Sequence, residues 1–114
     1  MLGNFKEITG QVVTNPLAHN AMMKVLVGPQ EGWDTHVMRV FELAPSGFTP
    51  KHAHDWPHIN VILEGQGTLF LNGIENNVEA GGYAFVPGGE LHQFKNVGDT
   101  PFKFICIVPI EGHK

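Results

Sequence analysis

The chain has 114 residues, of which 42% are hydrophobic and only 16% are charged, and its formal net charge is −4. A chain of this size builds one domain around one core, and this much apolar content argues against disorder. The seven lysines and arginines are scattered along the sequence, so we expect no nucleic acid partner. Cys106 is the one cysteine, which excludes an internal disulfide.

The first ten residues lack the apolar stretch of a signal peptide. No apolar run approaches the roughly 20 residues needed to span a bilayer. We therefore expect a cytoplasmic protein with no membrane partner and a single domain over residues 1–114.

The 14 glycines and 8 prolines divide the chain into short apolar segments, a pattern typical of strands. Residues 15–24 predict at most a short turn of helix. Asn72-Gly73 predicts a type I′ hairpin turn, because both residues tolerate a positive φ. Seven or eight short strands favour an all-β barrel or sandwich. The predicted strands cover residues 21–27, 36–43, 59–63, 67–71, 83–86, 92–96 and 102–108.

Alternation along the strands predicts which side chains face inward. Lys103 should face solvent, which places Phe104 and Cys106 inside. Arg39 shares a mostly apolar face with Phe41, so Arg39 is also expected to point inward. The outward apolar set fits either the interface of a homodimer or a second layer within the chain. That set is Val61, Leu63, Ile105 and Ile107.

Residues 52–58 read His-Ala-His-Asp-Trp-Pro-His. On an extended strand His52 and His54 project from one side roughly 7 Å apart, and metal–nitrogen bonds of about 2.0–2.1 Å let such rings converge on one ion. His58 begins the next strand, and His92 begins another that can lie beside them. The alternative is ordinary surface or core histidines, but each buried ring without a partner would cost about 1–3 kcal/mol. A shared metal ion is the simpler interpretation.

Two stretches of the sequence resemble the motifs of the cupin family, which are small double-stranded β-helix, or jelly-roll, barrels. The stretch 81–96 carries the second cupin motif in full. The matching residues are Gly81, Pro87, Gly89, His92 and Asn96.

The stretch 47–65 carries the first cupin motif with two departures. Four residues, where the family usually has five, separate Gly47 from His52. His58 stands where the family usually has a glutamate ligand. The resemblance implies a single cupin domain over residues 1–114.

By that resemblance His52, His54 and His92 carry over as metal ligands. With His58 they resemble the small cupins that hold a metal, some of them manganese, with four histidines. The alternative for His58 is that the glutamate was lost and His58 merely packs nearby.

The expected cofactor is one divalent transition metal, and imidazole suits Zn, Cu, Fe and Ni and, less strongly, Mn. Manganese or iron is favoured among these. An octahedral site leaves two positions open for water, O₂ or a chelating substrate. A tetrahedral zinc site would be closed by four histidines and would be structural.

Other inward residues should line a pocket beside the metal. Phe94 and Phe104 would make it apolar. Arg39 and Asn60 either orient a carbonyl or carboxylate or make structural hydrogen bonds or salt bridges, and Cys106 is more simply a small buried hydrophobe than a nucleophile. Three histidines are expected outside the site: His19, His36 and His113.

The leading functional hypothesis is a metal-dependent, dioxygenase-like oxygenase that acts on a small, partly apolar organic molecule. The resemblance implies that the metal brings O₂ and substrate together or polarises an enolisable carbonyl. The pocket shows no acid–base carboxylate, which favours redox or Lewis-acid chemistry over hydrolysis. The alternatives are a non-catalytic ligand-binding or metal-binding sensor, a metal-dependent isomerase of an enolisable carbonyl compound, and a purely structural metal site.

Overall fold

The computed structural model describes residues 1–113, which form strands, turns and three short 3-10 helices. The 3-10 helices are η1 (Phe5–Glu7), η2 (Pro29–Glu31) and η3 (Ile110–His113). The strands are β1 (Gln11–Val12), β2 (His19–Val27), β3 (His36–Phe48), β4 (His58–Glu64), β5 (Gln66–Leu71), β6 (Ile74–Glu79), β7 (Tyr83–Val86), β8 (Gln93–Asn96) and β9 (Phe102–Pro109).

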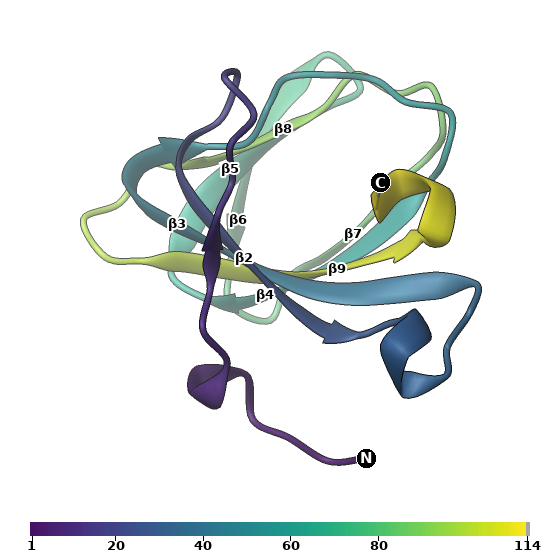
Figure 1. Cartoon of the computed structure of the whole chain (residues 1–114). Coiled ribbons are helices and arrows are strands. Elements are labelled where there is room, and N and C mark those ends of the chain that lie inside the picture. Colours follow the sequence, from purple (N-terminus) through teal and green to yellow (C-terminus); the bar gives the residue numbers. More distant parts are fainter. Residues whose placement is uncertain (114) are drawn as a thin grey trace.

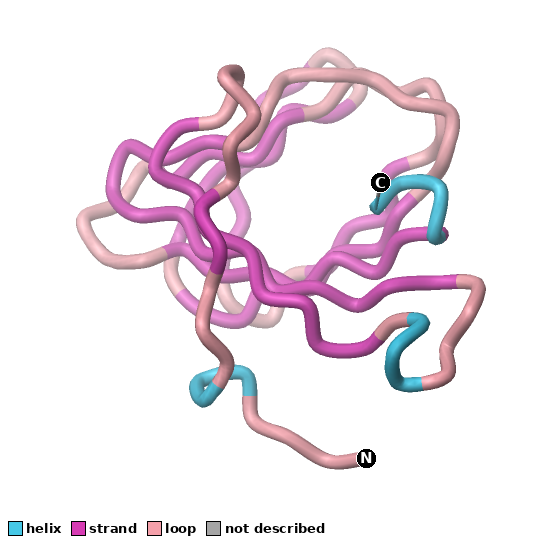
Figure 2. The backbone as a smooth tube through the Cα atoms, viewed as in Figure 1, coloured by secondary structure: helices cyan, strands magenta, loops and turns pink. Residues whose placement is uncertain are grey.

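One antiparallel sheet in the order β6-β5-β8-β3-β9-β4-β7 makes the body of the fold. The same sheet includes β2, which pairs with both β3 and β1. The sheet curls back on itself into a nearly closed ring, which can be followed in Figure 1 and Figure 2. Side chains of its strands line a hollow inside this ring. The all-β jelly-roll prediction is confirmed.

Strand β9 lies against both β3 and β4 and carries a wall of the hollow. Phe104 and Cys106 are buried and Ile105 between them is only partly buried, as alternation predicted. The ring of Phe104 stacks on Phe94 at a centroid distance of 4.1 Å and on Phe41 at 5.5 Å. These three aromatic side chains close one end of the hollow with an apolar surface.

Strand β3 is longer than predicted because it continues through Pro45-Ser46-Gly47 to Phe48. The sequence predicted a strand over residues 36–43 that ends at Pro45-Ser46-Gly47. Instead the pairing with β2 shifts register there, and Ser46 takes a positive φ of 65°. A Cβ at Gly47 would lie within 3.0 Å of three backbone carbonyl oxygens, so only glycine fits this bulge. The continued part of β3 pairs with β8, and β3 thereby joins strands β6, β5 and β8 to strands β9, β4 and β7 in one sheet.

Two other segments compare with the sequence expectation as follows. Residues 15–24, for which at most a short turn of helix was predicted, contain one turn, in which the N–H of Ala18 donates to the carbonyl of Asn15 at 2.9 Å, and the chain is extended from His19 onward. Strand β6 was not predicted, although the hairpin turn before it was. That turn is confirmed, since Asn72 and Gly73 have φ values of 55° and 73°.

The outward apolar face of β4 and β9 is only partly covered within residues 1–113. Ile59, Tyr83 and Phe85 extend it and are 48%, 85% and 59% exposed. The homodimer that would cover this face stays a prediction. Among residues 1–113, no helix is long or apolar enough to cross a membrane.

Candidate metal centre

The four histidines of the two motifs come together at one end of the hollow. His52 and His92 form an isolated antiparallel bridge, with N–H···O distances of 3.1 and 3.0 Å between their backbones. His54 follows in a loop, and His58 is the first residue of β4. The sequence predicted an extended strand that carries His52 and His54, but the structure has only a single bridge, at His52. The rings of His52 and His54 nevertheless lie close together, with centroids 4.9 Å apart.

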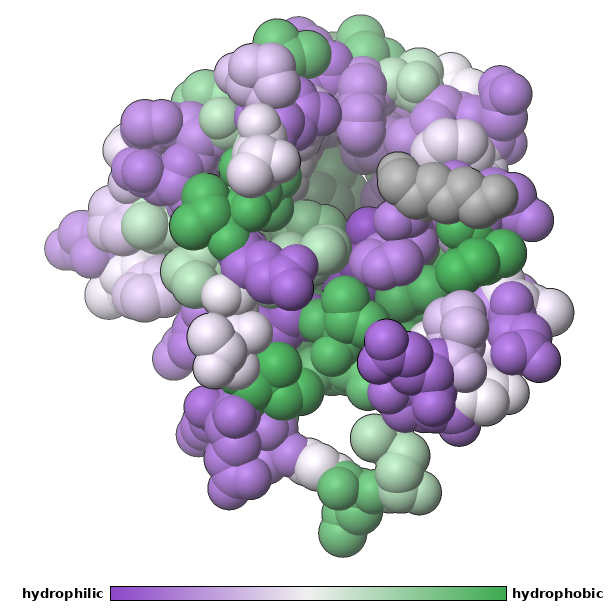
Figure 3. All heavy atoms as spheres, viewed as in Figure 1, coloured by the Kyte–Doolittle hydropathy of each residue, from purple (hydrophilic) through white to green (hydrophobic). Residues whose placement is uncertain are grey.

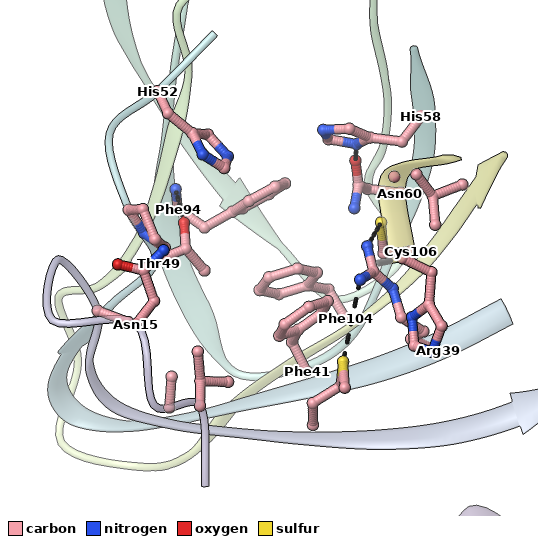
Figure 4. Close-up of a pocket in the computed structure, with 18 of the residues that line it drawn as sticks. Asn15, Arg39, Phe41, Thr49, His52, His58, Asn60, Phe94, Phe104 and Cys106 are labelled. Carbon is pink, nitrogen blue, oxygen red and sulfur yellow. Dashed lines mark hydrogen bonds between the residues drawn. The ribbon is translucent and has the colours of Figure 1, made fainter. Parts of the chain in front are cut away.

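Ring nitrogens of His52, His54 and His92 all lie within 4.8 Å of one another, which is close enough for one metal ion. His58 lies outside that group of three but beside it. Its Nε2 atom is 3.1 Å from Nε2 of His92, and both residues are buried. Figure 4 shows the rings of His52 and His58 facing each other across the top of the cavity.

Three of the four rings are oriented by an acceptor on the side away from the cluster. Nδ1 of His54 donates to the carbonyl of Trp56 at 2.7 Å, and Nδ1 of His92 donates to the carbonyl of Glu90 at 2.8 Å. Nδ1 of His58 donates to Oδ1 of Asn60 at 2.6 Å. Metal-ligating histidines are held in this way, with one ring N–H bonded to an oxygen and the other nitrogen free.

The orientation of Asn60 supports that tautomer for His58. The Asn60 side-chain Nδ2 donates to the carbonyl of Ile105 at 3.2 Å, so its Oδ1 is the atom that faces His58. An oxygen acceptor requires a proton on Nδ1 of His58. The Nε2 lone pair of His58 then points at His92.

The contact between His58 and His92 gives a direct test of whether a metal fits. With both Nδ1 atoms protonated, two Nε2 lone pairs face each other at 3.1 Å, where neither nitrogen can donate. Two nitrogens bonded at right angles to one ion at about 2.1 Å lie about 3 Å apart. The donor set and its spacing fit a shared cation.

The tight turn Pro87-Gly88-Gly89 holds the loop that carries His54. The backbone N–H of Gly89 donates to the carbonyl of His54 at 2.7 Å. A Cβ at Gly88 would overlap the carbonyl oxygen of Asp55, so glycine at this position allows the two segments to touch. The second motif thus supplies one histidine directly and positions another.

Replacing Gly88 with alanine should weaken metal binding, because the new methyl group pushes the loop at Asp55 and moves His54 out of the cluster. We expect about a 10- to 100-fold loss of metal affinity, similar to the loss of a ligand-orienting group. A titration with Mn²⁺ or Zn²⁺ measures it. Gly98→Ala is the matched control, since its Cβ would meet nothing closer than 3.6 Å; equal metal affinity of the two variants would contradict this role for Gly88.

The surroundings favour the neutral form of three of the clustered histidines: His52, His58 and His92. Burial lowers the pKa of His52 to about 4, with further lowering by His92 and His54. Although His52 is exposed as a residue, its ring lies against those two neighbours. Burial likewise lowers the pKa of His58 to about 4, and it lowers the pKa of His92. Neutral imidazole is the form that binds a metal.

A cavity of about 430 Å³ opens below the histidines. That volume is typical of a site for a small organic ligand. The space-filling view shows the opening as a hollow with a mostly polar rim and apolar side chains inside (Figure 3). Trp56 lines the cavity and stacks on the ring of His54 at 4.8 Å and 10°, so it both anchors the loop and borders the cavity.

The five pocket residues expected from the sequence all line this cavity: Arg39, Asn60, Phe94, Phe104 and Cys106. Arg39 donates to the sulfur of Cys106 at 3.2 Å. None of the described residues that line the cavity is an aspartate or glutamate. The cavity therefore presents one guanidinium and several imidazoles to a ligand, together with aromatic surface.

His113 lies in the cavity lining, although the sequence placed it outside the site in a terminal tail. The 3-10 helix η3 brings it there by packing Gly112 so closely against Trp56 that a Cβ would overlap the indole ring. His19 and His36 lie elsewhere, as expected: His19 packs on Phe48 and His36 stacks on Trp33. Nothing in the local sequence pattern marks His113, because its place depends on how the chain ends its last strand.

Comparison with known proteins agrees with this architecture. The profile of the cupin domain family matches residues 39–108, more than half of the chain. The 1-methylthio-D-xylulose 5-phosphate methylsulfurylase of Rhodospirillum rubrum is 30% identical over 80 residues, which are 70% of this chain and 51% of that protein. Glucose-6-phosphate isomerase of Pyrococcus furiosus is 35% identical over 75 residues, 58% of this chain and 40% of that protein. The chain thus spans about half or less of these curated relatives.

Solved structures extend the similarity over nearly the whole chain. The polyketide cyclase RemF from Streptomyces resistomycificus superposes with a TM-score of 0.89 at 30% identity, covering 96% of this chain and 78% of the cyclase. A cupin-2 domain from Rhodospirillum rubrum superposes with a TM-score of 0.83 at 21% identity, covering 96% and 74%, and supports the fold alone. Motifs, fold and family profile agree, and the chain belongs to the cupin domain family.

Proposed function

We propose that this chain is a metal-dependent enzyme that acts on a small, partly apolar organic molecule next to its histidine cluster. The observation that carries the proposal is the 3.1 Å contact between Nε2 of His58 and Nε2 of His92, which a shared cation explains. In this proposal His58 is the fourth ligand beside His52, His54 and His92. The cofactor is one divalent transition metal, with manganese or iron favoured.

The reaction we favour is Lewis-acid conversion of an enolisable carbonyl compound, such as a cyclisation or an isomerisation. A bound divalent ion supplies polarisation of a carbonyl oxygen. Two relatives support this class by name, since one is a polyketide cyclase and another a glucose-6-phosphate isomerase. The aromatic end of the cavity, formed by Phe41, Phe94 and Phe104, would hold the apolar part of the substrate and exclude water.

Dioxygenase chemistry is the second candidate. It is favoured by the absence of aspartate and glutamate from the described cavity lining, because oxygenation needs no acid–base carboxylate. Four neutral ligands leave the full charge of the ion in place for either reaction. The two reaction classes can be distinguished by experiment, because the dioxygenase reaction consumes O₂ and the Lewis-acid reaction does not.

The test is metal analysis of protein purified without oxygen, followed by incubation with a panel of β-dicarbonyl and aromatic hydroxy-carbonyl compounds. Incorporation of solvent deuterium at the α-carbon without O₂ uptake is the result expected for Lewis-acid chemistry. Uptake of O₂ in proportion to the product formed would instead support the dioxygenase reaction and exclude the Lewis-acid reaction. Metal or ligand binding with neither reaction would overturn the enzyme proposal in favour of a sensor or a structural site.

His58 decides between four and three ligands. His58→Glu restores the usual family pattern and adds an anionic oxygen donor, so metal should stay bound with a changed preference among metals. His58→Ala should hold metal about 10-fold or more weakly. Electron paramagnetic resonance of manganese- or copper-loaded protein follows the ligating nitrogens. Identical spectra for the parent protein and both variants would show that the site has three histidines.

A further inference from the structure

Arg39 lies near the start of β3 and lines the cavity, where its guanidinium contacts two sulfur atoms and an aromatic ring. In register it pairs with Cys106, which pairs with Asn60, so the three residues form one row across β3, β9 and β4. The guanidinium donates to Cys106 Sγ at 3.2 Å and to Met23 Sδ at 3.9 Å, and it lies 5.0 Å above the ring of Phe41. Figure 4 shows these sulfur contacts as dashed lines below His58 and Asn60.

No carboxylate within residues 1–113 pairs with Arg39. Its Nε atom is buried and has no hydrogen-bond partner among the described residues. Sulfur is a weak acceptor, so the guanidinium keeps most of its hydrogen-bonding capacity. Lys24 and Lys103 differ, because each of these neighbouring cations is paired with a glutamate at 3.0 Å. Arg39 is partly buried, and a charged group that is removed from water normally has a partner.

A second polar atom beside Arg39 also lacks a partner. Nδ1 of His113 is buried without a hydrogen bond in the described part of the chain, and His113 lines the same cavity. Burial and the nearby Arg39 lower the pKa of His113, so its ring is neutral near pH 7 and can donate from one nitrogen. Two unsatisfied nitrogens thus belong to two side chains that line the same cavity, and one of these side chains is positively charged.

We propose that Arg39, with His113 beside it, binds a carboxylate group of the substrate, so that this cavity selects small organic carboxylates with an apolar body. That the bound carboxylate belongs to a substrate rests on the function proposed above, whereas the carboxylate subsite itself does not. One planar guanidinium matches the two oxygens of a carboxylate. A phosphate group is a poorer match, because no lysine and no second arginine lines the described cavity. The apolar body lies on Phe41 and Phe104, and its far end reaches toward the histidines.

The test compares two probes of equal shape, phenylacetate and phenylacetamide, with inorganic phosphate as a third. Binding is measured by calorimetry or by ligand-detected nuclear magnetic resonance on the full chain, both metal-free and loaded with Zn²⁺. We expect the metal-free parent protein to prefer phenylacetate about 10- to 100-fold over phenylacetamide, as for charge-assisted hydrogen bonds. Phosphate should not compete.

Arg39→Met should abolish the preference for phenylacetate. Arg39→Lys keeps the positive charge and should keep part of the preference, so it tests the subsite even if the methionine variant fails to fold. Lys24→Met removes an equal charge from the outer face of the neighbouring strand and should leave the preference intact. A carboxylate preference that survives in Arg39→Met, that appears only with Zn²⁺ bound, or that phosphate abolishes would overturn the proposal. A His92→Ala variant without metal that still shows the Arg39-dependent preference would support the subsite even if the metal-dependent function failed.

Discussion

Replacing His92 with alanine should remove the metal from this protein. His92 is buried, its Nε2 faces that of His58 at 3.1 Å, and its ring lies 4.8 Å from that of His54. Its loss takes one ligand from the three-histidine group and also removes the ring that lies against His58. We expect metal affinity to fall more than about 100-fold, beyond the loss typical of a supporting group. Metal content after gel filtration and a competition titration with a chelator measure this.

The control for that experiment is His19→Ala. His19 is exposed and packs on Phe48, so the variant changes the histidine count without touching the cluster. It should keep the metal content of the parent protein. Equal metal content in the parent, His92→Ala and His19→Ala proteins would exclude the cluster as the metal site.

The metal-free protein should lose stability as the pH falls from about 6.5 to about 4. In the unfolded chain a histidine takes up a proton near pH 6.5, whereas folded His52 and His58 stay neutral down to about pH 4. The unfolded state therefore binds more protons in this window, and the free energy of unfolding decreases on acidification. The lowered pKa of buried His58 alone predicts a loss on the order of 2–3 kcal/mol; exposed His52 adds less because solvent screens it.

Urea unfolding of the chelator-treated protein between pH 7.5 and 4 measures this loss. The variant His58→Gln cannot be protonated at that position, so its unfolding free energy should depend less steeply on pH. His19→Ala should keep the slope of the parent protein. A free energy of unfolding that stays constant or rises as the pH falls toward 4 would contradict the neutral cluster.

The fold was predictable because its signals are local and periodic. Alternation along β9 placed Phe104 and Cys106 inside, and the same argument placed Arg39 in the cavity. The motif spacing indicated that His52 and His92 would meet, and their backbones do pair. Where a residue's position follows from its own strand or turn, its role could be inferred from the sequence.

The rest depends on contacts between distant segments. Strand β6 has an almost entirely exposed pattern and forms because β5 pairs with it along its whole length. The continuation of β3 past Pro45 depends on a bulge against β2. His113 reaches the cavity because η3 packs on Trp56. None of these contacts leaves a periodic signal in the residues concerned.

Each oriented imidazole of the cluster takes its acceptor from only two positions away along the chain. Trp56 orients His54, Glu90 orients His92 and Asn60 orients His58. The orientation of these rings is therefore fixed by local hydrogen bonds before a metal ion binds, so metal binding requires little reorganisation of the side chains. Such a rigid, uncharged set of nitrogens should exchange one divalent cation for another without refolding. Which ion it carries would then be decided by the metals its surroundings supply rather than by the fold.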